Sequence, residues 1–188
     1  MRSIERRDVK VSPRAAVLWM DEAAHLVTRG DMLFASSCRS SRTALVLMGH
    51  NLGSFHVALG GGETGRAETD GLFSLCNTKV FCANSDSVTN EWTSTLIGKA
   101  PRLFYNAGNS YQPQDWGSSL TGIGCNPSST AGMSEQMDYI VPPTHFSTLR
   151  TGGPGINDRH VDTIVVQSGR LFHESGSTWR PVTFRQRP

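Results

Sequence analysis

The sequence has few cysteines, little net charge and no long apolar run, and each scarcity narrows what the protein can be. The four cysteines of the 188-residue chain form no C-x-x-C pair and lie beside no histidines at zinc-site spacing, which indicates reduced, buried thiols. No run of about 18 apolar residues occurs, so we expect no membrane-spanning helix. The net charge of +2 is too small to argue for nucleic-acid binding by itself.

The start of the sequence also lacks the pattern of a secretory signal peptide. Residues 1–7, Met-Arg-Ser-Ile-Glu-Arg-Arg, lead into no apolar core. Together with the reduced thiols, this favours a cytoplasmic protein. The hydrophobic content of 37% and the charged content of 18% indicate a polar, loop-rich chain that can still bury a core.

A phosphate-binding loop of the form G-x-x-x-x-G-K-[ST] is missing as well. The nearest string, at 60–67, is Gly-Gly-Gly-Glu-Thr-Gly-Arg-Ala. Arg66 stands where the lysine should be, and Ala67 stands where a hydroxyl would bind Mg²⁺. Glu63 would bring a negative charge towards the phosphates. We therefore interpret this string as a flexible turn.

The most informative feature that is present is an apolar run that ends in two carboxylates, Val17-Leu18-Trp19-Met20-Asp21-Glu22. An unbroken apolar run predicts a strand buried on both faces of a parallel sheet. Acids at its carboxyl end lie where open α/β sheets bind ligands. In this Walker B layout, Asp21 would hold Mg²⁺ through its water shell and Glu22 would polarise the water that attacks the γ-phosphate of ATP. Alternatively, Asp21 caps the helix that follows.

The alternation of apolar strands with helical segments predicts an α/β fold, with a parallel sheet flanked by helices. Residues 99–135 show no hydrophobic period and predict a long loop. A hairpin is expected between 162–166 and 171–172, with a further strand at 179–184. This divides the chain into an α/β part at 1–100, an irregular linker at 101–140 and a small β-containing tail at 141–188. The predicted α/β elements are strands at 14–20, 43–48 and 78–82, and helices at 31–42, where Asp31 is the expected cap, at 68–76 and at 85–97.

The order of these motifs resembles the C-terminal part of type IV coupling proteins of the TraG/TraD kind, including their TraM-recognition region. The resemblance implies a partial RecA-like sheet of the P-loop NTPases in a hexameric ATPase on the cytoplasmic side of the inner membrane. It also implies ATP and Mg²⁺ as cofactors, and DNA, the relaxosome and type IV secretion components as partners. The matching segments are 16–23, 35–42, 47–52, 77–81, 86–91, 96–99, 141–153 and 161–170.

The resemblance also assigns roles to individual residues. Asp21 and Glu22 match the Walker B pair. Arg39 matches the arginine that reaches a neighbouring subunit's nucleotide, with Arg42 as the second candidate. His50 stands where the family has a glutamine that senses the γ-phosphate, and imidazole differs from an amide in reach and geometry. The alternatives are that both arginines are exposed helix residues and that His50 is a plain loop or packed histidine.

Two parts of the family pattern are missing: the phosphate loop and the N-terminal membrane helices. We therefore expect a truncated gene, a late start or a split reading frame, or a domain that has lost ATPase activity. On this basis we predict a fragment of a motor that pumps DNA or relaxase-bound DNA to a secretion channel. The alternatives are a non-catalytic scaffold that binds a relaxosome component, and a chromosome-partitioning or helicase-like translocase.

Overall fold

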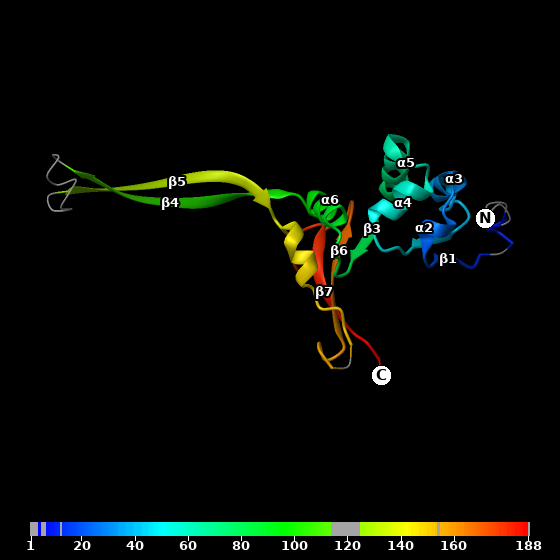
Figure 1. Ribbon diagram of the computed structural model, residues 1–188. Coiled ribbons are helices and arrows are strands. Elements are labelled where there is room, and N and C mark those ends of the chain that lie inside the picture. The colour runs from blue at the N-terminus through cyan, green and yellow to red at the C-terminus, as the bar shows by residue number, and fades with distance from the viewer. Residues whose placement is uncertain (1–3, 5–6, 12, 114–124, 154, 188) are drawn as a thin grey trace. The chain divides into compact units, whose positions relative to one another are not determined.

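The computed structural model describes residues 4, 7–11, 13–113, 125–153 and 155–187 (Figure 1). The chain divides into two compact units, one made of residues 1–97 and 141–188 and the other of residues 98–140. The first unit is a mixed α/β structure with two small sheets. The segment 141–188, predicted as a separate tail, therefore belongs to the same unit as the first ninety-seven residues.

The first sheet confirms two of the predicted strands and their parallel direction. Strand β1 (Ala16–Met20) pairs with β2 (Thr43–Leu47) in a register that sets Ala16 opposite Thr43 and Met20 opposite Leu47. The short helix α2 (Ala23–Leu26) and α3 (Arg29–Ser37) connect the two strands. After β2 come α4 (Leu52–Ala58) and α5 (Gly62–Ser74). The core between these elements consists of Ala23, Val27, Phe55, Leu59 and Leu72.

The expectation that β1 is buried on both faces is wrong. Burial alternates along the strand, and Val17 and Trp19 are 60% and 66% exposed. The core packs against one face only, with Met20 and Leu47 lying against it. An apolar run thus marks a strand here, but one face of that strand is uncovered in the described residues.

The third predicted strand does not join this sheet, so the prediction of one parallel sheet with three strands is wrong. Strand β3 (Thr78–Phe81) pairs antiparallel with β6 (His160–Gln167), which pairs antiparallel with β7 (Trp179–Arg185). Strand β7 confirms the predicted strand at 179–184, but the predicted partner of β6 at 171–172 is part of the connection instead. The apolar pattern identifies β3 as a strand, whereas its partner strand β6 lies more than eighty positions later in the chain.

A second core lies beneath this antiparallel sheet. Helix α6 (Ser87–Ile97) and the 3₁₀ helix η1 (Pro143–Thr148) pack together there. Helix α6 confirms the predicted helix at 85–97: the Asp86 carboxylate accepts the Thr89 backbone N–H, and Gly98 follows the helix at a φ of 104°. The buried residues of this core are Ile97, Val141, Phe146, Ile164 and Val166.

Two helices begin and end at other residues than predicted. Thr28, not Asp31, is the N-cap of α3, and Asp31 is the third helical residue, whose carboxylate accepts the Thr28 backbone N–H in a capping box. Helix α3 ends at Ser37, and residues 38–42 form turns. Helix α5 begins at Gly62, so most of the string 60–67, interpreted from the sequence as a turn, is helical.

One ion pair ties the segment after η1 to the middle of the second sheet. The Arg150 guanidinium donates through Nε and Nη2 to the two carboxylate oxygens of Asp162, at 2.6 and 2.7 Å. The Thr183 hydroxyl on β7 donates to the same carboxylate at 2.7 Å. These bonds, with those from Arg150 the strongest, hold the pKa of Asp162 far below its ordinary value.

We therefore expect the free energy of unfolding of Asp162→Asn to fall less steeply at acidic pH than that of the parent protein. A carboxyl whose folded pKa is depressed stabilises the fold above its unfolded pKa of about 3.9, and this contribution is lost as the pH falls towards the folded pKa. Urea unfolding of the parent protein at a series of pH values should show this loss below about pH 4. The matched control is Asp70→Asn on the exposed surface of α5. Its free energy of unfolding should fall with decreasing pH as steeply as that of the parent. Equal acid slopes for parent and Asp162→Asn would contradict the prediction.

The second unit corrects the prediction of an irregular linker at 101–140. Strands β4 (Lys99–Pro113) and β5 (Cys125–Tyr139) pair antiparallel over fifteen residues each, from Lys99 opposite Tyr139 to Pro113 opposite Cys125 (Figure 1). Prolines and glycines concealed this ribbon in the sequence. Proline has no N–H, so the ladder accepts it only where that group would point away from the partner strand. Opposite pairs along an antiparallel ladder alternate between pairs that exchange hydrogen bonds and pairs that do not. The three pairs that contain proline lie an even number of positions apart, so all three belong to the same class: Pro101–Met137, Tyr111–Pro127 and Pro113–Cys125.

Candidate functional site

The carboxyl edge of the β1–β2 sheet brings together three of the predicted site residues. Asp21 and Glu22 follow β1, His50 follows β2, and parallel strands end at the same edge. The Glu22 carboxylate and the His50 imidazole lie 3.0 Å apart, between Oε1 and Nε2. The structure therefore brings Glu22 and His50 together at this edge.

A tight turn after β1 sets the direction of both carboxylates. The Asp21 carboxylate accepts the Glu22 backbone N–H at 2.9 Å. Glu22 itself has a φ of 49°, in the left-handed region that few non-glycine residues adopt. Glu22, not Asp21, is the N-cap of α2, and it makes no side-chain cap bond. The alternative role of Asp21 as a helix cap is thus not what the structure shows.

The pair of Glu22 and His50 lies at the surface. Their side chains are 52% and 78% exposed, and exposed ion pairs contribute at most about 1 kcal/mol. An ionised carboxylate only accepts hydrogen bonds, so Nε2–H of His50 is the donor in this contact. While this bond exists, Nε2 of His50 is engaged with Glu22 and one oxygen of Glu22 is engaged with His50. The arrangement thus holds the candidate base beside the candidate sensor.

The loop that carries His50 is held from the N-terminal end of α6, by residues that sequence reasoning missed. The Asn84 side-chain amide donates to the His50 carbonyl at 3.0 Å, and the Leu52 backbone N–H donates to the Thr89 hydroxyl at 3.0 Å. The Thr89 hydroxyl and the Thr89 backbone N–H both donate to the Asp86 carboxylate. These two bonds hold the pKa of Asp86 below its ordinary value. The signal in the sequence is the Asp-x-x-Thr cap of α6, which predicts the helix start but not the contact with the His50 loop.

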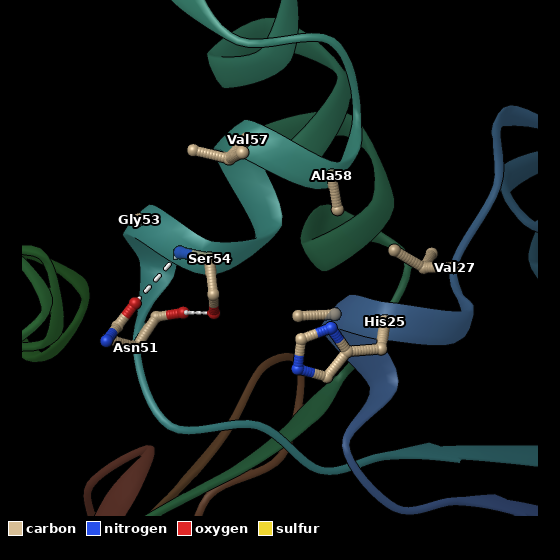
Figure 2. Close-up of a pocket in the computed structure, with 8 residues that line it drawn as sticks. His25, Val27, Asn51, Gly53, Ser54, Val57 and Ala58 are labelled. Atoms are coloured by element: carbon tan, nitrogen blue, oxygen red, sulfur yellow. Dashed lines mark hydrogen bonds between the residues drawn. The ribbon is translucent and has the colours of Figure 1, made fainter.

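A shallow pocket lies beside this edge (Figure 2). Its walls come from α2 with its C-cap residue and from α4 with its N-cap residue, the first helices after the two parallel strands. His25 faces the turn that contains Asn51 and Ser54, as Figure 2 shows. The Asn51 side chain is committed to the cap of α4, because its oxygen accepts the Ser54 backbone N–H at 2.9 Å. The lining residues are Ala24, His25, Val27, Asn51, Gly53, Ser54, Val57 and Ala58.

Arg39 and Arg42 lie at the opposite edge of the sheet. Both belong to the turns between α3 and β2, so neither is a helix residue as the alternative interpretation held. The Arg42 backbone N–H donates to the Arg39 carbonyl, the Arg42 carbonyl accepts the Ala16 N–H, and the Arg42 guanidinium donates to the Pro13 carbonyl at 3.1 Å. A five-residue strand spans about 16 Å, so within one chain neither arginine lies at the edge that holds Glu22.

Asp21 fits only part of a magnesium site. Mg²⁺ keeps several water molecules and is bound through one or two carboxylates together with substrate phosphates, so the exposed Asp21 carboxylate suits a water-mediated contact. Within the part of the chain that the structure describes, no group of three or more His, Cys, Asp or Glu side chains is arranged to hold a metal ion. The amide cradle and lysine of a phosphate loop would have to come from elsewhere, because the three lysines of the sequence lie at 10, 79 and 99.

Comparison of the sequence with protein-family models and with curated proteins finds no match. No helix among the described residues has both the length and the apolar character needed to cross a bilayer.

The structure describes the side chains of three of the four cysteines. Cys38 and Cys76 are partly buried and Cys82 is exposed, and all three are free thiols. Burial raises the pKa of the Cys76 thiol, and the neighbouring Lys79 opposes this rise. The side chain of Cys125 lies outside the described residues. The expectation of buried thiols is therefore wrong for these three cysteines, since two are half-buried and one is exposed.

Proposed function

We propose that this chain is the C-terminal part of a type IV coupling ATPase, which pumps DNA or relaxase-bound DNA to a secretion channel from the cytoplasmic side of the inner membrane. The observation that carries the proposal is the contact of Glu22 with His50 at the carboxyl edge of two parallel strands. In P-loop ATPases the acidic pair and the sensor occupy this edge, on neighbouring strands. The uncovered face of β1, with Val17 and Trp19, also suits a parallel sheet whose second layer of helices comes from another segment.

The proposal gives each residue a task. Asp21 would hold Mg²⁺ through water, and Glu22 would polarise the attacking water. His50 would orient the Glu22 carboxylate through the bond from Nε2–H and would lie next to the γ-phosphate. Arg39 and Arg42, at the other edge, would serve the nucleotide of a neighbouring copy in a hexamer. ATP and Mg²⁺ would bind only when a phosphate loop from a preceding segment completes the site.

We expect the purified chain to hydrolyse ATP at a negligible rate. Phosphoryl transfer depends on positioning and charge neutralisation by loop, lysine and metal together, and Asp21 and Glu22 are one part of that set. The measurement is phosphate release with and without DNA, for the parent and for Glu22→Gln. Glu91→Gln on the exposed side of α6 is the matched control for a change of one carboxylate. Robust turnover that disappears in Glu22→Gln but persists in Glu91→Gln would show a complete nucleotide site in this chain.

The experiment that tests the proposal itself adds the missing part. When an upstream segment with G-x-x-x-x-G-K-[ST] is present in the same protein, we expect DNA-stimulated ATP hydrolysis that requires Glu22. If no such segment precedes this chain in its genomic DNA, or if the extended protein hydrolyses ATP equally well with Glu22→Gln, the proposal is wrong.

One observation favours the alternative of a non-catalytic scaffold. Four apolar side chains of the β4–β5 ribbon are between 56% and 77% exposed: Leu103, Tyr105, Met133 and Met137. Exposed apolar side chains that gather on one element mark interaction sites. A scaffold would bind a relaxosome component whether or not nucleotide is present. Binding that persists in Glu22→Gln and without ATP would favour this function.

A further inference from the structure

Helices α3 and α5 lie side by side and run in the same direction. The Arg29 guanidinium at the start of α3 lies 2.8 Å from the Glu68 carboxylate of α5. One turn further along both helices, a Cβ atom at Gly71 would lie 3.0 Å from the Met32 Cε atom. In both contacts the residue of α5 follows its partner in α3 by the same number of positions. The helices are therefore parallel, and their C-terminal ends lie close together.

A cysteine stands at each of these two ends. Cys38 is the C-cap of α3, and Cys76 comes directly after the C-cap of α5. Both thiols are free and partly buried. The Cys38 thiol donates to the Ala35 carbonyl at 3.2 Å, and the Cys76 thiol donates to the Leu72 carbonyl at 3.7 Å. Because both cysteines follow the last helical residue of their element, the backbone at each can adjust to bring the two sulfur atoms together.

The two thiols lie near enough to influence each other. Burial raises the pKa of Cys76, the neighbouring Lys79 opposes this rise, and the Cys38 thiol adds to it. One ionisable group shifts the pKa of another in this way only at short distance. The Lys79 ammonium also donates to the Cys76 carbonyl at 2.6 Å, so a cation lies beside the pair. A cation next to a cysteine favours the thiolate, which is the reactive form of that residue.

We propose that Cys38 and Cys76 are a redox-active pair that forms a reversible disulfide bond on reaction with an oxidising small-molecule disulfide. Cys38 reacts first, because the raised pKa of Cys76 keeps that thiol protonated. The Cys38 thiolate attacks one sulfur of the small molecule, which forms a mixed disulfide and releases the other half as a thiolate. The Cys76 thiol then gives its proton to solvent, attacks the Cys38 sulfur and releases the second half. Two protein thiols lose two electrons, and one small-molecule disulfide is reduced to two thiols.

The bond would fasten the turns before β2 to the segment before β3. The Cys38 carbonyl accepts the Thr43 backbone N–H at 3.0 Å and the Ser41 hydroxyl at 2.9 Å, so Cys38 already holds the turn that contains Arg39. The closed loop would include β2, α4 and α5, and closing a loop stabilises a fold mainly by restricting the unfolded chain. Neither cysteine belongs to the Glu22 edge, so the bond forms whether or not this chain is part of an ATPase.

The test uses the full chain with Cys82→Ser/Cys125→Ser, which leaves Cys38 and Cys76 as its only thiols. The protein is equilibrated with mixtures of reduced and oxidised glutathione, in native buffer and in urea that unfolds it. Mass spectrometry after blocking of free thiols measures the open, mixed and bridged forms. We expect the equilibrium constant for bridge formation to be at least about tenfold larger in native buffer than in urea. By the same thermodynamic cycle, the bridged form should unfold at a higher urea concentration than the reduced form.

Single variants and the parent separate this bond from other thiol chemistry. Cys76→Ser should stop at the mixed disulfide of Cys38 with glutathione, and Cys38→Ser should react more slowly, because Cys76 stays protonated. Strand β3 separates Cys82 from Cys76 by four residues, about 13 Å, so proteolysis of the oxidised parent should yield a peptide that joins Cys38 to Cys76. An equilibrium constant no larger in native buffer than in urea, mixed disulfides on both cysteines without a bridge, or a bridge from Cys82 in the parent would each overturn the proposal.

Discussion

Mixing Arg39→Ala subunits with Glu22→Gln subunits is expected to recover part of an ATPase activity that each variant alone has lost. The experiment uses the protein in which an upstream segment supplies the phosphate loop. Arg39 precedes β2 and Glu22 follows β1, so the two residues lie at opposite edges of the sheet, about 16 Å apart along the strands. We therefore expect Arg39 to serve the nucleotide of a neighbouring copy and not that of its own chain.

The expected effect is large because the guanidinium would stabilise the charge that spreads over the transferring phosphoryl group. Arginines that act in this way contribute about 10³-fold or more to turnover. In a mixed ring, some interfaces combine an intact Glu22 with an intact Arg39, and only those sites turn over. The measurement is phosphate release as a function of the mixing ratio, which should pass through a maximum between the two inactive extremes.

Arg66→Ala, on the exposed side of α5, is the matched control and should keep full activity alone. Arg42 is a poorer control, because its guanidinium holds the Pro13 carbonyl and its loss would disturb the start of the sheet. Absence of any recovery, with co-assembly of the two variants confirmed by mass, would show that Arg39 is only a surface residue of the turn before β2.

The site edge could be predicted from the sequence because it depends on local signals. Two apolar runs with a helical segment between them predict parallel strands, and parallel strands must end at one edge. Asp21, Glu22 and His50 follow those runs directly, so their meeting needed no knowledge of distant contacts. The resemblance to coupling proteins, and the roles it implies for Arg39 and Arg42, stay predictions.

The partners of β3 and the second unit could not be predicted in the same way. Strand β3 pairs with β6, and no local pattern indicates a contact over that separation. The ribbon was interpreted as a linker because its prolines and glycines suggest loops, although Met133, Met137 and Tyr139 alternate with Ser134, Gln136 and Asp138. That period of two was a signal for a strand, and it lies in the second half of the segment, where polar composition concealed it.

Gly65→Ala should destabilise the first unit strongly, by about 1–3 kcal/mol or more. Gly65 is buried in α5, and a Cβ atom there would lie 2.2 Å from the His56 carbonyl oxygen of α4. A backbone atom cannot move aside as a flexible side chain can, so α4 and α5 would have to separate. That movement would loosen the core around Phe55, Leu59 and Leu72, and α4 carries one wall of the pocket.

The measurement is the midpoint of urea unfolding, read by circular dichroism. Gly53→Ala is the matched control, since a Cβ atom at Gly53 in α4 would meet its nearest neighbour at an ordinary 3.5 Å. Alanine favours a helix over glycine by about 1 kcal/mol, so Gly53→Ala should be neutral or stabilising. If propensity alone decided the outcome, Gly65→Ala would also stabilise the protein. A midpoint for Gly65→Ala at or above that of the parent would therefore show that α4 and α5 do not approach each other at this glycine.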